Sequence, residues 1–198
     1  MKEFRDRVAV VTGAGSGIGR AMAAKFAAEG MKVVLADVQE DALAEVESEL
    51  RGRDASVLAV LADVSKIAQV ENLARRTLES FGAVHILCNN AGVSGGGRAT
   101  WDATEADWQW VLGVNLWGVI HGIRVFVPIM LNQGTEGHIV NTASVLGLSS
   151  GPGAPYGVSK HAVVRLSEGL YYDLLARGSR LRASVLCPGM IATRIIQS

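Results

Sequence analysis

Six short segments of the chain consist almost entirely of valine, isoleucine, leucine and alanine, without alternation of apolar and polar positions. Strands of a parallel sheet that is covered by helices on both faces have this pattern, because neither face meets water. We therefore predict six buried strands, at Val8–Val11, Val33–Ala36, Val57–Ala62, Val84–Cys88, His138–Ala143 and Ala183–Cys187.

Longer stretches with helical spacing separate these strands, at residues 17–29, 39–51, 66–81, 104–132, which has room for two helices, and 155–177. Thr104 and Asp107 have the spacing of a capping box, and Pro155 suits the first turn of the last helix. This alternation predicts an α/β fold, a doubly wound and mainly parallel sheet of at least six strands with helices on both faces. Without repeats or low-complexity linkers, residues 1–198 are expected to form a single domain.

The composition excludes several classes of protein. Of the 198 residues, 49% are apolar and only 19% are charged, which excludes a disordered chain. The 19 basic and 19 acidic residues cancel, so no net field attracts nucleic acid or an acidic membrane. The most membrane-like window, residues 111–131, is interrupted by Asn115, His121 and Arg124, which favours a buried helix over a bilayer span.

Cysteine and histidine give no sign of a disulfide framework or a metal site. Cys88 and Cys187 end predicted strands and are expected to be small core residues. The four histidines have no metal-ligand spacing, so we expect no bound metal. The charged residues 1–7 lead directly into the first strand without the apolar region of a signal peptide, and we expect a cytoplasmic protein.

In a sheet of this kind, ligands bind in the crevice beyond the carboxyl ends of the strands. The residues that follow the six predicted strands are all polar, glycine or proline: Gly13, Asp37, Asp63, Asn89 and Asn90, Ser144, and Pro188 and Gly189. We therefore expect a binding site at this edge of the sheet.

The first strand is followed by a glycine-rich turn with the pattern G-x-x-x-G-x-G, formed by Gly13, Gly17 and Gly19. Glycines at these positions allow a tight turn and the close approach of backbone N–H groups to a pyrophosphate at a helix N-terminus. A plain glycine-rich turn is the alternative. The P-loop of nucleotide triphosphatases is excluded, because no GK[ST] follows.

Asp37 ends the second strand, where a carboxylate can accept hydrogen bonds from both ribose hydroxyls of an adenosine and would repel a 2′-phosphate. No arginine or lysine stands at Ser16 or directly after Asp37 to bind that phosphate. The pattern favours NAD over NADP. The alternative is that Asp37 only caps the following helix.

Tyr156 and Lys160 are four residues apart on the last predicted helix, which places both side chains on one face. A tyrosine that acts as acid and base near neutral pH needs its pKa lowered by about three units, roughly 4 kcal/mol. An ammonium at about 4 Å supplies energy of that order at an effective dielectric constant near 20.

Taken together, these stretches resemble the short-chain dehydrogenase/reductase family, in its NAD-dependent branch with short subunits. The matching residues lie along almost the whole chain and in the order of the family: Thr12–Gly19, Asp63 and Val64, Asn89–Gly92, Asn115, Ser144, Tyr156–Lys160, Pro188 and Gly189, and Thr193. The resemblance implies a Rossmann fold, a nicotinamide cofactor and oxidoreduction of an alcohol or carbonyl substrate.

The resemblance also implies roles for single residues. Tyr156 would be the general acid and base, Lys160 would lower its pKa and hold the nicotinamide ribose, and Ser144 would hydrogen-bond the substrate oxygen. Asn115 would anchor a water molecule beside Lys160. The implied cofactor contacts are Gly13, Ser16, Ile18 and Gly19 at the pyrophosphate, Asp37 at the adenosine ribose, Asp63 and Val64 at the adenine, Asn90 at the adjoining ribose, and Pro188, Gly189 and Thr193 at the nicotinamide and phosphates.

Members of this family continue into a helical substrate lid and a seventh strand, which we expect to be lacking in residues 1–198. The family also pairs two helices across a dimer axis, which implies a homo-dimer or tetramer. The corresponding helices here are apolar on more than one face, through Trp117, Val119, Ile120, Phe126 and Val127 and through Ala162, Val163, Leu166 and Leu170. A deeply buried helix within one subunit is the alternative.

Two other functions use the same scaffold. An epimerase or dehydratase would oxidise and re-reduce its substrate, but the glycine pattern and Asn89–Gly92 argue against it. A truncated NAD-binding sensor or scaffold would need no acid–base pair, so the Ser144, Tyr156 and Lys160 set argues against that function.

Overall fold

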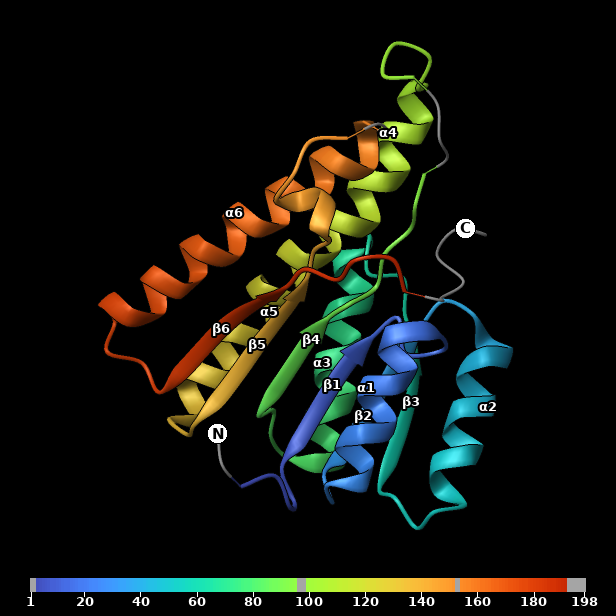
Figure 1. The fold of residues 1–198 in the computed structure, drawn as a ribbon. Coiled ribbons are helices and arrows are strands. Elements are labelled where there is room, and N and C mark those ends of the chain that lie inside the picture. The colour runs from blue at the N-terminus through green and yellow to red at the C-terminus, as the bar shows by residue number, and fades with distance from the viewer. Residues whose placement is uncertain (1–2, 96–98, 152–153, 192–198) are drawn as a thin grey trace.

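A computed structural model of the protein describes residues 3–95, 99–151 and 154–191. Within these ranges the chain forms one six-stranded sheet in which every neighbouring pair of strands is parallel (Figure 1). The strand order is β3-β2-β1-β4-β5-β6. The strands are β1 (Val8–Thr12), β2 (Lys32–Asp37), β3 (Val57–Leu61), β4 (Ile86–Asn89), β5 (Gly137–Thr142) and β6 (Leu181–Leu186). The predicted α/β fold is thereby confirmed.

Helices follow the strands in alternation. They are α1 (Gly17–Ala28), α2 (Glu40–Arg51), α3 (Ile67–Phe81), α4 (Glu105–Leu112), the π-helix η1 (Gly113–Trp117), α5 (Gly118–Gln133), the short 3₁₀-helix η2 (Val145–Gly147) and α6 (Ala154–Ala176). The capping box of Thr104 and Asp107 is present at the start of α4. Residues 104–132 hold the two expected helices, α4 and α5, and the π-helix η1 joins them without a break.

Two apolar cores cover the two faces of the sheet. On one face, side chains of β1 and β2 such as Val10 and Val34 pack with Leu73 of α3, Phe126 of α5 and Leu170 of α6. On the other face, alternate residues of the same strands pack against α1 and α2, through Ala23, Leu43 and Val46. Every residue of β1 is buried, as its continuous apolar run predicts.

The edge strand β6 departs from the prediction that all six strands are buried on both faces. Its exposure alternates, and Arg182, Ser184 and Leu186 are exposed. The helices of the described chain that pack near β6, mainly α6, cover only one of its faces. Cys187, expected in the core, is correspondingly half-buried, whereas Cys88 in the central strand β4 is fully buried.

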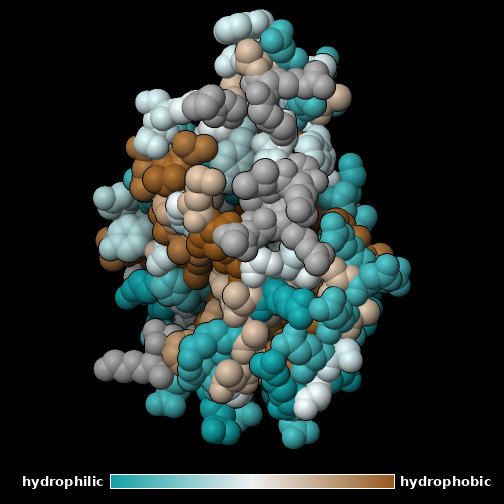
Figure 2. Space-filling view, turned by 45° about the vertical axis from the view of Figure 1, so that its right-hand side comes forward, coloured by the Kyte–Doolittle hydropathy of each residue, from teal (hydrophilic) through white to brown (hydrophobic). Residues whose placement is uncertain are grey.

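The continuous helical run Glu105–Gln133 is long and apolar enough to cross a membrane, and among the described helices it alone meets that criterion. Core helices meet the same criterion. In this fold 44% of its most apolar window is buried, and α5 packs against α3 and β4. The outer surface is hydrophilic over much of the lower half of the molecule in Figure 2, while apolar side chains gather in the upper half.

Candidate active site

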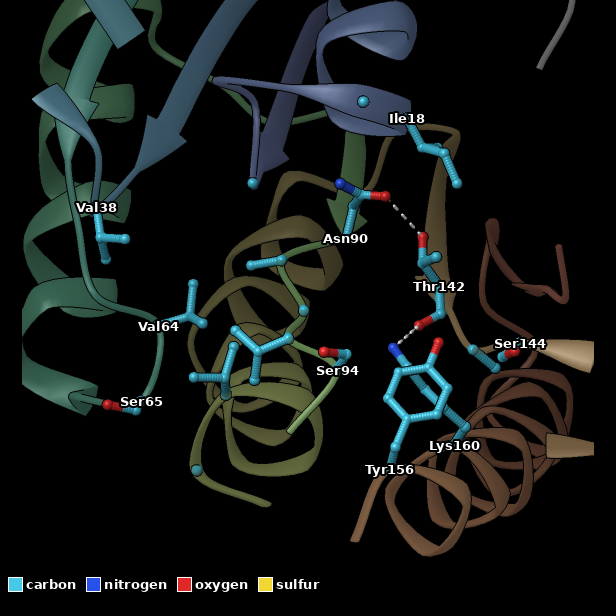
Figure 3. Close-up of a pocket in the computed structure, with 18 of the residues that line it drawn as sticks. Ile18, Val38, Val64, Ser65, Asn90, Ser94, Thr142, Ser144, Tyr156 and Lys160 are labelled. Carbon is cyan, nitrogen blue, oxygen red and sulfur yellow. Dashed lines mark hydrogen bonds between the residues drawn. The ribbon is translucent and has the colours of Figure 1, made fainter. Parts of the chain in front are cut away.

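A cleft of about 1620 Å³ lies along the carboxyl ends of the strands. It runs from the turn after β1 and the ends of β2 and β3, past the end of β4, to β5 and the start of α6. Figure 3 shows Val38, Val64 and Ser65 at one end of this cleft and Ser144, Tyr156 and Lys160 at the other, with Asn90 and Ser94 between them. The β1–β4 neighbours are where the crossover direction of the sheet reverses, and such switch points bind ligands.

The turn after β1 can be built only from glycine at two of its positions. Gly13 has φ +65°, and a Cβ on it would lie 2.8 Å from Cα of Ala91. A Cβ on Gly19 would lie only 2.0 Å from the carbonyl oxygen of Gly13. The first turn of α1 therefore packs directly on the turn that precedes it, and its unpaired N–H groups point toward the cleft.

The predicted cofactor residues Gly13, Ser16 and Ile18 line the cleft, but Gly19 does not. Gly19 is buried behind the turn, where it lets the helix approach Gly13. Its contribution is thus to the shape of the turn rather than to the lining. Of the other predicted cofactor residues, Asp37, Asp63, Val64, Asn90, Pro188 and Gly189 line the cleft, and Thr193 lies outside the described residues.

The carboxylate of Asp37 is held in place by two backbone groups. Oδ2 accepts a hydrogen bond from the N–H of Gly15 at 2.8 Å, and Oδ1 accepts one from the N–H of Gln39 at 3.0 Å. The alternative role as a helix cap is not realised, because Gln39 is the N-cap of α2 and no side chain caps that helix. Each carboxylate oxygen has a second lone pair, so both can still accept a hydrogen bond from a ligand hydroxyl.

Asn90 links three neighbouring strands. Its side-chain nitrogen donates to the carbonyl of Thr12 at the end of β1, at 3.0 Å. Its side-chain oxygen accepts from the hydroxyl of Thr142 at the end of β5, at 3.2 Å (Figure 3). The backbone N–H of Asn90 donates to the Thr12 hydroxyl at 2.9 Å. Asn90 therefore fixes the floor of the cleft between its two ends.

Tyr156 and Lys160 lie on the same face of α6, one turn apart. The Lys160 nitrogen is 5.5 Å from the centre of the Tyr156 ring, and it donates to the carbonyl of Thr142 at 3.0 Å (Figure 3). Lys160 is almost completely buried, and this burial lowers the pKa of its ammonium to about 8. Tyr156 is half-buried and lines the cleft.

Ser144 lies where β5 ends and η2 begins. Its Oγ accepts a hydrogen bond from the N–H of Leu146 at 3.2 Å, which leaves the hydroxyl proton to be donated. Only 7% of Ser144 is exposed, and that part faces the cleft. Its hydroxyl is thus a fixed donor on the side of the cleft where Tyr156 and Lys160 lie (Figure 3).

Asn115 lies behind the cleft and does not line it. It is fully buried in the π-turn η1, where its amide accepts from the N–H of Val93, donates to the Val93 carbonyl, and donates to Oγ of Ser159. A Cβ on Gly92 would lie 3.3 Å from Oδ1 of Asn115 and 3.4 Å from Nζ of Lys160. Asn115 therefore ties the loop after β4 to the helix that carries Tyr156 and Lys160.

Several residues that organise the cleft have no signal in the sequence. Thr12, Thr142, Ser159 and His121 act through contacts with residues that are 18 to 79 positions away in the chain. Single threonine, serine or histidine residues of this kind are common everywhere. Only their position at the carboxyl ends of strands, for Thr12 and Thr142, could have suggested a role.

The geometry joins a tyrosine and a buried lysine at one end of the cleft to a glycine turn and a carboxylate at the other. A family model described as short chain dehydrogenase matches residues 7–198 of this chain. The chain belongs to the short-chain dehydrogenase/reductase family. Members transfer a hydride between a nicotinamide cofactor and a secondary alcohol or ketone, and the chain is an oxidoreductase of this kind.

Similar members of the family are known from bacteria. The chain is 43% identical to 1-deoxy-11-beta-hydroxypentalenate dehydrogenase of Streptomyces exfoliatus, over 98% of this chain and 70% of that protein. It is 39% identical to levodione reductase of Leifsonia aquatica, over 98% of this chain and 73% of that protein. A crystal structure of a short-chain dehydrogenase/reductase from Burkholderia phymatum in complex with NAD has a TM-score of 0.98 and 55% identity, covering 100% of this chain and 70% of that one. These names give no support to a sensor or scaffold without turnover.

Proposed function

We propose that this short-chain dehydrogenase/reductase uses NAD, and that Tyr156 is its general acid and base. The observation that carries the proposal is the joint placement of Tyr156, Lys160 and Ser144 in one cleft with the glycine turn and Asp37. An acid–base pair has no purpose in a protein that only binds a dinucleotide.

The cleft fits a dinucleotide in three respects. Side chains are excluded at Gly13 and Gly19, so a pyrophosphate can approach the N–H groups at the start of α1. Asp37 keeps free acceptor positions beside this turn. The length of the cleft joins both sites to Tyr156. The Burkholderia phymatum relative was crystallised with NAD, which supports the same cofactor here.

The preference for NAD rests on the end of β2. Asp37 is followed by Val38, which is 61% exposed and lines the cleft, and by Gln39. A carboxylate and an apolar side chain at this position give a 2′-phosphate no positive partner, whereas two ribose hydroxyls can donate to the carboxylate.

In the direction of alcohol oxidation, the phenolate oxygen of Tyr156 takes the proton of the substrate hydroxyl. A bound nicotinamide cofactor would accept the hydride from the carbon that carries this hydroxyl. Ser144 donates a hydrogen bond to the substrate oxygen, where negative charge develops during the reaction. In the opposite direction Tyr156 returns its proton to the carbonyl oxygen.

Lys160 brings a positive charge to the acid–base residue, because its buried ammonium lies 5.5 Å from the centre of the Tyr156 ring. Its hydrogen bond to the Thr142 carbonyl orients the nitrogen. With its pKa near 8, Lys160 remains mostly protonated at pH 7. Asn115 holds Val93, in the loop after β4, and Ser159 in place behind Tyr156 and Lys160.

The experiment that tests this mechanism measures NADH formation with a panel of secondary alcohols, for the wild type and Tyr156→Phe. The variant keeps the ring but has no proton to transfer, so we expect kcat/KM to fall at least about 100-fold, within the range for a general acid–base group. NAD binding, measured by calorimetry, should be retained. Turnover at the wild-type rate in Tyr156→Phe would exclude the mechanism.

Cofactor choice is tested with Asp37→Ala. The wild type should prefer NAD, and the variant should lose about 10- to 100-fold in kcat/KM for NAD, because hydrogen bonds to a charged group are removed. Its activity with NADP should fall less or increase. Equal affinity of the wild type for NAD and NADP would contradict the proposed preference.

We further propose that the protein is a homo-oligomer, a dimer or tetramer, through α6. Most apolar residues on which the sequence suggested this, including Val119, Phe126, Val127, Val163 and Leu170, are buried within one subunit. The support now comes from other side chains. Tyr171, Tyr172 and Leu175 of α6 are exposed apolar groups. A cytoplasmic location and action as a single cofactor-binding domain complete the proposal.

A further inference from the structure

His121 of α5 is a buried histidine that the proposed mechanism does not use. Only 8% of it is exposed, and it lines the cleft at the end opposite Tyr156, beside Val64. Its Nδ1 lies 2.9 Å from the carbonyl oxygen of Val64. A carbonyl can only accept, so Nδ1 carries the proton of this hydrogen bond. The ring is also stacked at an angle against Trp117, with 5.7 Å between the ring centres.

Helix α5 touches Val64 at a second point, one turn before His121. A Cβ on Gly118 would lie 2.6 Å from Cγ2 of Val64. With any residue other than glycine at position 118, the helix could not approach this side chain so closely. The carbonyl and the side chain of Val64 are therefore both held by α5.

Among the described residues, other hydrogen bonds also hold the loop that contains Val64, including one from the N–H of Ala62 to the carbonyl of Asp37 on β2 at 2.9 Å. Asp63 accepts from the N–H of Ser65 at 2.9 Å, and its own N–H donates to the Gln69 side chain at 2.7 Å. Within the described part of the chain, no hydrogen bond engages the N–H of Val64. This donor belongs to a residue that lines the cleft, while the carbonyl of the same residue is turned to His121.

We propose that His121 is a positioning residue for the nucleotide base. It holds the Val64 carbonyl against α5, and this hydrogen bond sets the backbone orientation in which the Val64 N–H is offered to an acceptor nitrogen of the adenine ring. The inference rests on the proposed binding of NAD in this cleft. It means that the affinity for the adenosine half of NAD also depends on His121, a residue of helix α5 rather than of the loops after the strands.

The matched test compares His121→Leu with His121→Asn. The side-chain amide nitrogen of asparagine occupies nearly the same position as Nδ1, whereas leucine has a similar shape and no donor. Calorimetry with ADP as the adenosine probe should show a roughly five- to tenfold weaker affinity for His121→Leu, the range for loss of one neutral hydrogen bond. His121→Asn should recover most of the wild-type affinity. Nicotinamide mononucleotide, which has no adenine, should bind all three proteins equally.

His138→Leu is the control, because His138 also forms a side-chain hydrogen bond, to Ser184, but is the second residue of β5 and does not line the cleft. It should leave the ADP affinity unchanged. If His121→Leu does not fold, Gly118→Ala tests the same contact, because the added Cβ would displace the side chain of Val64. This variant should bind ADP more weakly and should bind nicotinamide mononucleotide as the wild type does.

Equal ADP affinity of His121→Leu and the wild type would overturn the inference, as would equal losses for ADP and nicotinamide mononucleotide, which indicate general loosening of the fold. Failure of His121→Asn to restore binding would also overturn it. If the wild type binds neither ADP nor NAD, the proposed cofactor itself is wrong and the inference falls with it.

Discussion

At the scale of single residues, Lys160 carries a charge into a part of the molecule from which water is excluded. Only 2% of it is exposed, and burial lowers its pKa from 10.5 to about 8. The unfolded chain binds this proton more tightly than the folded chain does. The difference reduces the stability of the fold at neutral pH by an amount on the order of 3 kcal/mol, a reduction that shrinks as pH rises from about 8 to 10.5.

Lys160→Met should therefore be inactive but more stable than the wild type. The methionine keeps the apolar stem and removes the buried charge, which should stabilise the fold at pH 7. The loss of the hydrogen bond to Thr142 offsets part of this gain, so we expect the free energy of unfolding to increase by about 1–3 kcal/mol. At pH 10 the advantage should be much smaller, because the wild-type lysine is then neutral in the folded state. Urea unfolding at pH 7 and pH 10 measures the difference in the free energy of unfolding between the variant and the wild type. A variant less stable than the wild type at pH 7 would show that Lys160 stabilises the fold.

At the scale of elements, the β1–α1 turn requires glycine for two different reasons. Gly13 adopts a left-handed backbone conformation and packs on Ala91, whereas Gly19 has an ordinary conformation but no room for a Cβ. The first requirement is conformational and the second is steric. Both determine how closely α1 approaches the end of β1, and hence where its N–H groups lie.

Gly19→Ala should abolish measurable NAD binding and destabilise the protein, because the new Cβ would meet the Gly13 carbonyl at 2.0 Å. The matched control is Gly157→Ala on α6, where a Cβ meets nothing within 4 Å. That variant should gain up to about 1 kcal/mol from the better helix propensity of alanine and bind NAD normally. Calorimetry and thermal unfolding measure both effects. Normal NAD binding by Gly19→Ala would show that the turn tolerates displacement.

The elements also show what the sequence could and could not predict. The strands of the central sheet and the capped start of α4 were predictable, because runs such as Val8–Val11 and the Thr104–Asp107 pair have local physical causes. The π-turn around Asn115 was not, because its apolar spacing also fits an ordinary helix. The exposed face of β6 has a local sign in the sequence, because Arg182 and Ser184 alternate with apolar residues there.

The site was predictable wherever a residue type and a spacing act together, as for Gly13, Gly17 and Gly19 or for Tyr156 and Lys160. The supporting contacts were not. His121 reaches Val64 and Lys160 reaches Thr142 only because the strands and helices pack in this order. Such contacts depend on three-dimensional packing, and a single sequence has no local signature for them.

At the scale of the whole molecule, the exposed apolar side chains of α6 make this helix the expected contact between subunits. Light scattering should show a dimer or tetramer for the wild type. The double variant Tyr172→Glu and Leu175→Glu introduces two charges and should shift it toward monomer. Leu61→Glu on the other edge of the sheet is the control, since Leu61 is 53% exposed and lies on β3. Unchanged assembly of the double variant would place the contact elsewhere.

The bridge that Asn90 makes between β1 and β5 has a consequence for the thermodynamics of ligand capture. Because one amide links two strands that are not neighbours, the spacing of β1 and β5 in the middle of the cleft is set before any ligand arrives. This part of the protein therefore loses little conformational entropy when a ligand binds across it.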